Sequence, residues 1–69
     1  MKMYSAELWN RGSSDSRYIT PMGLVEDLPC LDENYLWSSE EEAHDAIMQE
    51  SRKWYDPWGV QCAIKEHNI

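Results

Sequence analysis

One segment of this chain has the spacing of an amphipathic helix, and it opens with a clear start signal. Ser39 and Glu42 match the capping box S-x-x-E, in which each side chain satisfies a backbone N–H group of the first turn. Apolar residues then recur at helical spacing on one face, namely Ala43, Ala46, Ile47 and Trp54. Acidic residues in the first turn, with Arg52 and Lys53 near the end, suit the helix dipole. The pattern predicts a helix from about Ser39 to Tyr55.

Two β-prone runs precede this helix. Met3–Trp9 alternates with period two, which is typical of a half-buried strand, and its apolar face consists of Tyr4, Ala6 and Leu8. Residues 10–16 have the composition of a loop, and Arg17–Thr20 is a short β-prone run. We therefore expect a β-hairpin. Pro21 ends its second strand because proline has no backbone N–H group to donate.

The remaining segments complete the predicted architecture. Residues 22–34 fit either a short extra strand or a single helical turn, and Tyr35–Trp37 fits either a brief strand or the lead-in to the helix. Asp56–Gly59 has the residues that a type I turn prefers. The next run alternates again, with one face formed by Val60, Cys62 and Ile64. These elements predict an α+β fold in one domain, residues 1–69. A small antiparallel sheet of about three strands, in the order β-β-α-β, is covered on one face by a single helix.

The size of the chain limits its core and its compartment. A domain of 69 residues buries only about 60% of its unfolded surface, but four Trp and four Tyr can each bury roughly 150–250 Å². No segment approaches the roughly 20 apolar residues that cross a bilayer, and no signal-peptide stretch is evident at the start. We expect a soluble protein of the cytoplasm. Cys30 and Cys62 are too few for a disulfide framework, so we expect reduced thiols, at least one of them in the core.

The acidic residues are concentrated in the middle of the chain. Thirteen acidic and six basic residues give a formal net charge of −7. Between Arg17 and Arg52 there is no Lys or Arg, while nine acidic residues occur there: Glu26, Asp27, Asp32, Glu33, Glu40, Glu41, Glu42, Asp45 and Glu50. This segregation disfavours nucleic acid and anionic membrane as partners and favours a basic protein surface. The alternative is a solvated face, since capping alone explains the three acids at the helix start.

Aromatic residues near the predicted helix-to-strand turn could add contact area. Trp and Tyr are enriched in binding hot spots because they combine large area with a polar atom. We expect Trp54 in the core, and Tyr55 and Trp58 at the surface. The predicted partner-binding residues are Glu26, Asp27, Asp32, Glu33, Glu40, Glu41, Glu42, Asp45, Tyr55 and Trp58.

Metal-binding and catalytic patterns are weak. Glu41-x-x-His44 matches a spacing found in di-iron bundles, but those sites take ligands from several helices. The two cysteines and two histidines lack the close pairings of zinc modules. The chain has no phosphate-binding loop and no Gly-x-Ser-x-Gly elbow, and its size leaves little room for a water-excluding pocket. We therefore expect no metal, no cofactor and no enzymatic activity; the alternative is a metal or small-molecule enzyme built on Glu41 and His44.

In size, acidity and its pattern of a sheet with one helix, the chain resembles the small proteins with which phages disable host defences, namely anti-CRISPR proteins and other DNA mimics. The resemblance covers the whole chain as a profile, and a phage origin would imply the cytoplasm of the host cell. It implies that carboxylates occupy the Lys/Arg surface that a host nuclease complex uses for DNA or guide RNA. Arg11 and Arg17 depart from this pattern, because a uniform DNA mimic would not need them.

Two functions follow from these observations. The first is a non-catalytic inhibitor that docks on a basic, nucleic-acid-binding surface of a protein or ribonucleoprotein complex, without binding nucleic acid or membrane directly. The alternative is a structural or assembly module. Such a module would form a homodimer by edge-strand pairing through residues 60–66, or serve as a small subunit of a larger complex.

Overall fold

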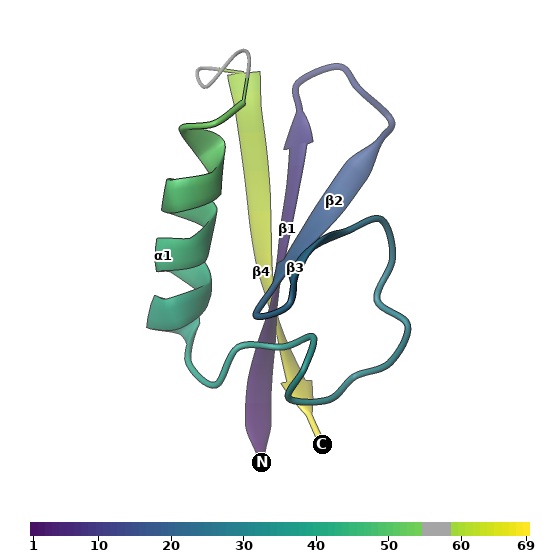
Figure 1. Cartoon of the computed structure of the whole chain (residues 1–69), viewed down its shortest axis with the longest axis vertical. Coiled ribbons are helices and arrows are strands. Elements are labelled where there is room, and N and C mark those ends of the chain that lie inside the picture. Colours follow the sequence, from purple (N-terminus) through teal and green to yellow (C-terminus); the bar gives the residue numbers. More distant parts are fainter. Residues whose placement is uncertain (55–58) are drawn as a thin grey trace.

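A four-stranded antiparallel sheet carries one helix in this computed structural model, which describes residues 1–54 and 59–69 (Figure 1). Along the chain the elements are β1 (Lys2–Asn10), β2 (Ser16–Thr20), β3 (Gly23–Val25), α1 (Glu40–Ser51) and β4 (Val60–Asn68). The strands lie in the order β3-β2-β1-β4, and every neighbouring pair is antiparallel. The predicted α+β class and the hairpin of β1 and β2 are confirmed, with four strands where about three were expected.

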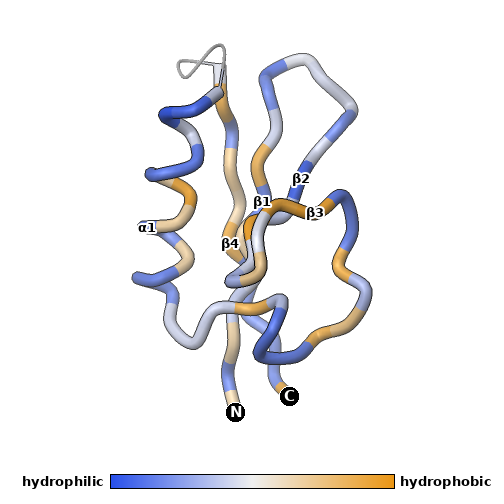
Figure 2. The backbone as a smooth tube through the Cα atoms, viewed as in Figure 1, coloured by the Kyte–Doolittle hydropathy of each residue, from blue (hydrophilic) through white to orange (hydrophobic). Residues whose placement is uncertain are grey.

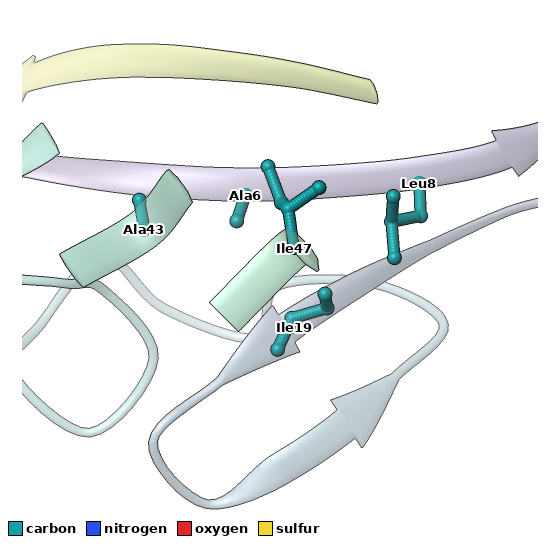
Figure 3. Close-up of a cluster of buried hydrophobic side chains, with 5 residues drawn as sticks. All are labelled: Ala6, Leu8, Ile19, Ala43 and Ile47. Atoms are coloured by element: carbon teal, nitrogen blue, oxygen red, sulfur yellow. The ribbon is translucent and has the colours of Figure 1, made fainter. Parts of the chain in front are cut away.

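The core lies between α1 and the central strand β1. Ala6 and Leu8 of β1, Ile19 of β2, and Ala43 and Ile47 of α1 are buried together (Figure 3). Burial of each large aliphatic side chain contributes roughly 1.5–3 kcal/mol. Partly buried residues pack around this cluster, namely Tyr4, Trp37, Ala46, Trp54, Val60 and Ile64. The apolar faces predicted for the helix and for the first strand are therefore confirmed.

The opposite face of β1 is also covered, which its alternation did not predict. Met3 and Ser5 point away from the helix by the pleat of the strand, yet both are buried, as is Leu36. Leu36 belongs to the long connection between β3 and α1. The next residue, Trp37, exchanges two backbone hydrogen bonds with Tyr4, with N–O distances of 2.8 and 2.7 Å. The segment before the helix therefore forms a single β-bridge that continues the sheet beyond the end of β2.

The extra strand, β3, occupies part of the stretch that the sequence left undecided. Thr20 ends β2, and its hydroxyl donates to the carbonyl oxygen of Gly23 at 2.7 Å and accepts from the N–H of Met22 at 3.1 Å. Gly23 has φ of +120°, a conformation that residues with a Cβ rarely adopt. This tight turn reverses the chain and pairs Leu24 with Ile19.

The helix begins where the capping pattern predicts. Ser39 is the N-cap, and its hydroxyl oxygen accepts from the N–H of Glu42 at 3.1 Å. The second half of the capping box differs from the prediction. The Glu42 carboxylate accepts from the hydroxyl of Ser38 at 2.7 Å instead of reaching the backbone of the N-cap residue.

The helix ends earlier than predicted, at Ser51, so the expected extent to residue 55 is too long. After this point the backbone bonds span three residues instead of four. Lys53 donates to the carbonyl of Glu50 at 2.9 Å, and Trp54 donates to that of Ser51 at 3.3 Å. This tighter turn brings Trp54 against the core. Arg52 and Lys53 consequently lie beyond the last helical turn.

Replacing the N-cap Ser39 with alanine is expected to lower the free energy of unfolding by about 1 kcal/mol, because the N–H of Glu42 loses its acceptor. In a domain of this size the melting temperature should fall by about 4–8 °C. Ser38→Ala is the matched control, since it removes an exposed bond to a side chain and should cost less than about 0.5 kcal/mol. Thermal unfolding of both variants tests this, and a larger loss for Ser38→Ala would contradict the N-cap assignment.

The prediction that at least one cysteine lies in the core is wrong, since Cys30 and Cys62 are both free thiols and both exposed. Cys62 has the predicted facing, because it pairs with the buried Leu8. It lies on β4, however, which is an outer strand of the sheet. Among the described residues, no further strand lies beside β4 to cover the Cys62 side chain. Cys30 lies in the connection between β3 and α1.

Candidate functional site

A groove opens at the end of the sheet where β2 stops and the segment before the helix takes its place beside β1. One hollow of about 420 Å³ is lined by Met1, Met3, Pro21, Glu33, Leu36, Trp37, Ser38 and Glu42. A second, of about 250 Å³, is lined by Trp37, Glu42, Asp45, Ala46 and Gln49. The two hollows share Trp37 and Glu42, so they adjoin. We call them together the acidic groove.

The floor of the acidic groove is apolar and firmly held. Leu36 is 1% exposed and Met3 is 5% exposed. The indole N–H of Trp37 donates to the carbonyl oxygen of Ile19 at 2.8 Å. The backbone N–H and C=O groups of Trp37 both form hydrogen bonds with the backbone of Tyr4. The sequence did not predict Leu36 and Trp37 as site residues. The signal that could have identified them is the apolar triplet Tyr35–Trp37, which is separated from the capping Ser39 by one residue.

Three of the predicted acidic residues form the rim of this groove. Glu33 comes from the connection after β3, whereas Glu42 and Asp45 come from the first turns of α1. All three are exposed, and none takes part in the ion pairs found among the described residues. The groove therefore combines an apolar floor with uncompensated negative charge.

The other predicted acids lie elsewhere. Glu26 forms an ion pair with Arg17 at 3.6 Å. Asp27 lies near Tyr18, whose pKa is above its ordinary value because of burial and, secondarily, because of the charges of Glu7 and Asp27. Tyr18 follows the pleat to the face opposite the buried Ile19, and Asp27 lines neither part of the acidic groove.

The acids at the helix start divide between its two flanks. Glu40 lines a separate hollow with Tyr4, Ile64 and Glu66, on the β4 side of the helix. Glu41 is exposed on α1 and lines neither part of the acidic groove. Figure 2 shows the hydrophilic residues along the outer side of α1 and in the connection after β3. The predicted aromatic contacts, Tyr55 and Trp58, lie outside the described residues.

Asp32 orders the connection between β3 and α1. Its carboxylate accepts from the Cys30 thiol at 3.0 Å and from the N–H of Asn34 at 2.9 Å. Both hydrogen bonds lower the pKa of Asp32, the thiol bond most, so this carboxyl is ionised at neutral pH. The stability that these hydrogen bonds contribute is fully present above the ordinary pKa of an aspartate. It is lost as the pH falls through the lowered pKa of Asp32. The same hydrogen bond raises the pKa of Cys30.

Replacing Asp32 with asparagine is expected to lower the pKa of Cys30 and to speed its alkylation at about pH 8, because the thiolate is the reacting form. Cys62 is an internal control in the same molecule, since it is also exposed and lies on a different element. Mass spectrometry of the two cysteine peptides over time measures both rates. An unchanged rate at Cys30, or an equal increase at Cys62, would contradict the assigned hydrogen bond.

Among the described residues, no three His, Cys, Asp or Glu side chains come together in a group that could hold a metal ion. His44 is exposed on α1, and His67 lies within 2.9 Å of the Ser5 hydroxyl. Within residues 1–54 and 59–69, the single helix, α1, is too short and too polar to cross a membrane.

The chain matches no protein-family model, no curated protein and no solved structure. The residues and geometry of the acidic groove are therefore the basis for a proposed function.

Proposed function

We propose that this chain is a non-catalytic binding protein that docks on a basic, nucleic-acid-binding surface of a protein or ribonucleoprotein complex. One observation carries the proposal. The acidic groove has an apolar floor at Leu36 and Trp37 and exposed carboxylates of Glu33, Glu42 and Asp45 on its rim. Basic groups of the partner that form ion pairs with these carboxylates would no longer be free to bind DNA or RNA. Inhibition by docking is also the mechanism of the anti-CRISPR and DNA-mimic proteins that the chain resembles.

The charge and the floor have separate roles in this proposal. The net charge of −7 and the exposed Glu40 and Glu41 attract a basic surface over a long range, which raises the association rate. The apolar floor acts after contact. Lysine and arginine have apolar stems that cover hydrophobic surface, and their charged heads interact well with a Trp ring. A basic side chain over Trp37 would thus have its charge close to the rim carboxylates.

The floor also distinguishes the acidic groove from a solvated charged surface. A solvated charged face needs no accessible apolar side chains beside it, whereas here the exposed Met1 and Pro21 and the half-buried Trp37 line the same hollow as the acidic rim. Hot spots of binding typically have such an apolar centre and a polar rim. We therefore narrow the proposed contact surface from all eight predicted acids to the three of the groove, with Glu40 and Glu41 contributing at longer range.

A binding titration against a purified RNA-guided nuclease complex tests the proposal. The titration is repeated from about 0.01 M to about 1 M salt, over which the Debye length falls from about 30 to about 3 Å. Affinity is expected to fall steadily, and added chain is expected to reduce DNA cleavage by the complex. Binding that does not weaken with salt would contradict the role of charge. No binding at the lowest salt would overturn the anti-CRISPR form of the proposal.

A second candidate function is assembly, favoured by the position of β4 at an outer edge of the sheet. A homodimer or a larger complex could form along this strand. The acidic groove lies at the side where β2 ends, so such an assembly would leave it open. Docking and assembly can therefore both occur in one molecule.

A further inference from the structure

The two outer strands of the sheet differ in how open they are to pairing. β3 has three residues and follows a tight turn with Pro21 and Gly23, so it offers little backbone to another strand. β4 has nine residues, from Val60 to Asn68, and contains no proline. Its pairing with β1 runs one-to-one without a bulge, from Lys2–Asn68 to Asn10–Val60. Proteins commonly protect sheet edges with short strands, prolines, bulges or charged side chains, and of these β4 has only the charges of Lys65 and Glu66.

The hydrogen-bond pattern identifies which backbone groups of β4 point outward. Ile69 donates to the carbonyl of Met1 at 2.8 Å, and Arg11 donates to that of Gly59 at 2.7 Å. In an antiparallel pair, residues that bond to the neighbouring strand alternate with residues that do not. The odd-numbered residues from 59 to 69 therefore bond to β1. The N–H and C=O groups that point away from β1 belong to Val60, Cys62, Ile64, Glu66 and Asn68.

We propose that two copies of this chain pair along β4, antiparallel, about a two-fold axis that passes between their Ile64 residues. The inference rests on the assembly role and is independent of docking by the acidic groove. An axis perpendicular to the sheet joins the two sheets into one and leaves both helices on the same face. It also pairs outward residues only with outward residues, Val60 with Asn68, Cys62 with Glu66, and Ile64 with Ile64. About ten backbone hydrogen bonds would form, two for each pair.

The charge distribution favours a second copy as the occupant. Each chain carries −7, but β4 has only one basic and one acidic residue, and Glu66 is already paired with Lys2 at 3.3 Å. The strand is therefore the part of an acidic surface where two copies meet with little repulsion. Its apolar Val60 and Ile64 pack against the core, so pairing would extend the covered layer.

The register with its axis at Ile64 is more favourable than the registers with an axis one residue to either side. With the axis at Ile64, Lys65 of one copy is opposite Ala63 of the other, and like charges are not directly opposed. An axis at Lys65 would place two lysines opposite each other, which is destabilising. An axis at Ala63 would place Asn68 opposite residue 58, which lies outside β4 and outside the described residues. The Ile64 axis uses all nine residues of the strand.

The first experiment measures molecular mass by sedimentation over a wide concentration range. Wild type should change from monomer to dimer as concentration rises, and added salt should strengthen the dimer by screening the two acidic chains. Glu66→Pro removes an outward donor without removing a bond to β1, so it should remain folded by circular dichroism and stay monomeric. Glu66→Ala is the matched control, which keeps the backbone N–H and should still dimerise.

A cross-linking experiment tests the register and does not depend on a proline variant. In a Cys30→Ser, Cys62→Ser background, Ala63→Cys and Lys65→Cys are prepared as separate proteins. Directly opposite residues lie within disulfide range, whereas diagonal ones lie at about 7–8 Å and do not. Oxidation of the mixture should therefore give a cross-linked dimer, while neither protein alone should.

The outcomes separate the inference from the assembly role on which it rests. A monomer at every concentration overturns pairing between two copies, and leaves only the form of the assembly role in which a strand of another protein occupies the β4 edge. Dimers that survive Glu66→Pro overturn pairing along β4 but leave assembly through another surface. Cross-linking of either cysteine variant alone, or no cross-linking of the mixture, overturns the Ile64 register.

Discussion

Leu8→Ala is expected to lower the free energy of unfolding by about 2–5 kcal/mol. Leu8 has no exposed surface and lies between β2 and β4 in the cluster that α1 covers (Figure 3). Truncation removes apolar contacts on several sides and leaves a cavity that the regular strands cannot easily close. Stability of about 0.1 kcal/mol per residue gives this domain only about 7 kcal/mol in total. The substitution should therefore remove a large share of it.

The matched control for this prediction is Leu24→Ala, the same chemical change on β3. Leu24 is 46% exposed and lies on the outer strand, so its truncation should cost less than about 1 kcal/mol. Urea unfolding monitored by Trp fluorescence measures both variants, and equal slopes with denaturant would show that only stability has changed. Comparable losses at Leu8 and Leu24 would contradict the position of the core between α1 and β1.

Neutralising the rim of the acidic groove is expected to weaken binding to a basic partner by about tenfold. The variant carries Glu33→Gln, Glu42→Gln and Asp45→Asn, which keep the shape of each side chain and remove its charge. Exposed ion pairs contribute about 0.5 kcal/mol each, and three of them correspond to roughly a tenfold change in Kd. The loss should shrink at high salt, where the wild-type advantage is already screened.

The control for the groove variant changes the net charge equally at other places. Asp15→Asn, Glu26→Gln and Glu66→Gln remove three negative charges from the hairpin, the end of β3 and β4. None of these residues lines the acidic groove, and Glu26 and Glu66 are already in ion pairs. Their removal should reduce affinity about twofold or less through the long-range field alone. Equal losses for both variants would show that overall charge, and not the groove, attracts the partner.

The beginning of the helix and the alternation of the strands were predictable because their causes are local. Ser39 and Glu42 are three residues apart and form a bond within one turn. Ala43 and Ile47 are four residues apart and share a face on any helix. The end of the helix was not predictable from local spacing. The turn tightens after the helix where Trp54 packs against the core, and that is a tertiary contact.

The candidate site was predictable only in its chemistry. The concentration of acidic residues is a property of the sequence, but their grouping depends on the path of the connection between β3 and α1. That path brings Glu33 to the same hollow as Glu42, and it buries Leu36 beside Met3 of β1 in the lining of that hollow. The pairing of Glu26 with Arg17 also joins residues that are distant in the chain. Neither contact follows from spacing along the sequence.

By itself, the sequence determined the α+β class, the helix start, the hairpin and the excess negative charge, since each depends on composition or on residues a few positions apart. Only the tertiary structure decided which acids share the groove with an apolar floor, that both thiols are exposed, and that β4 is an open edge. These features depend on contacts between segments far apart in the chain. Such contacts are selected by the packing of the whole molecule, which no local pattern records.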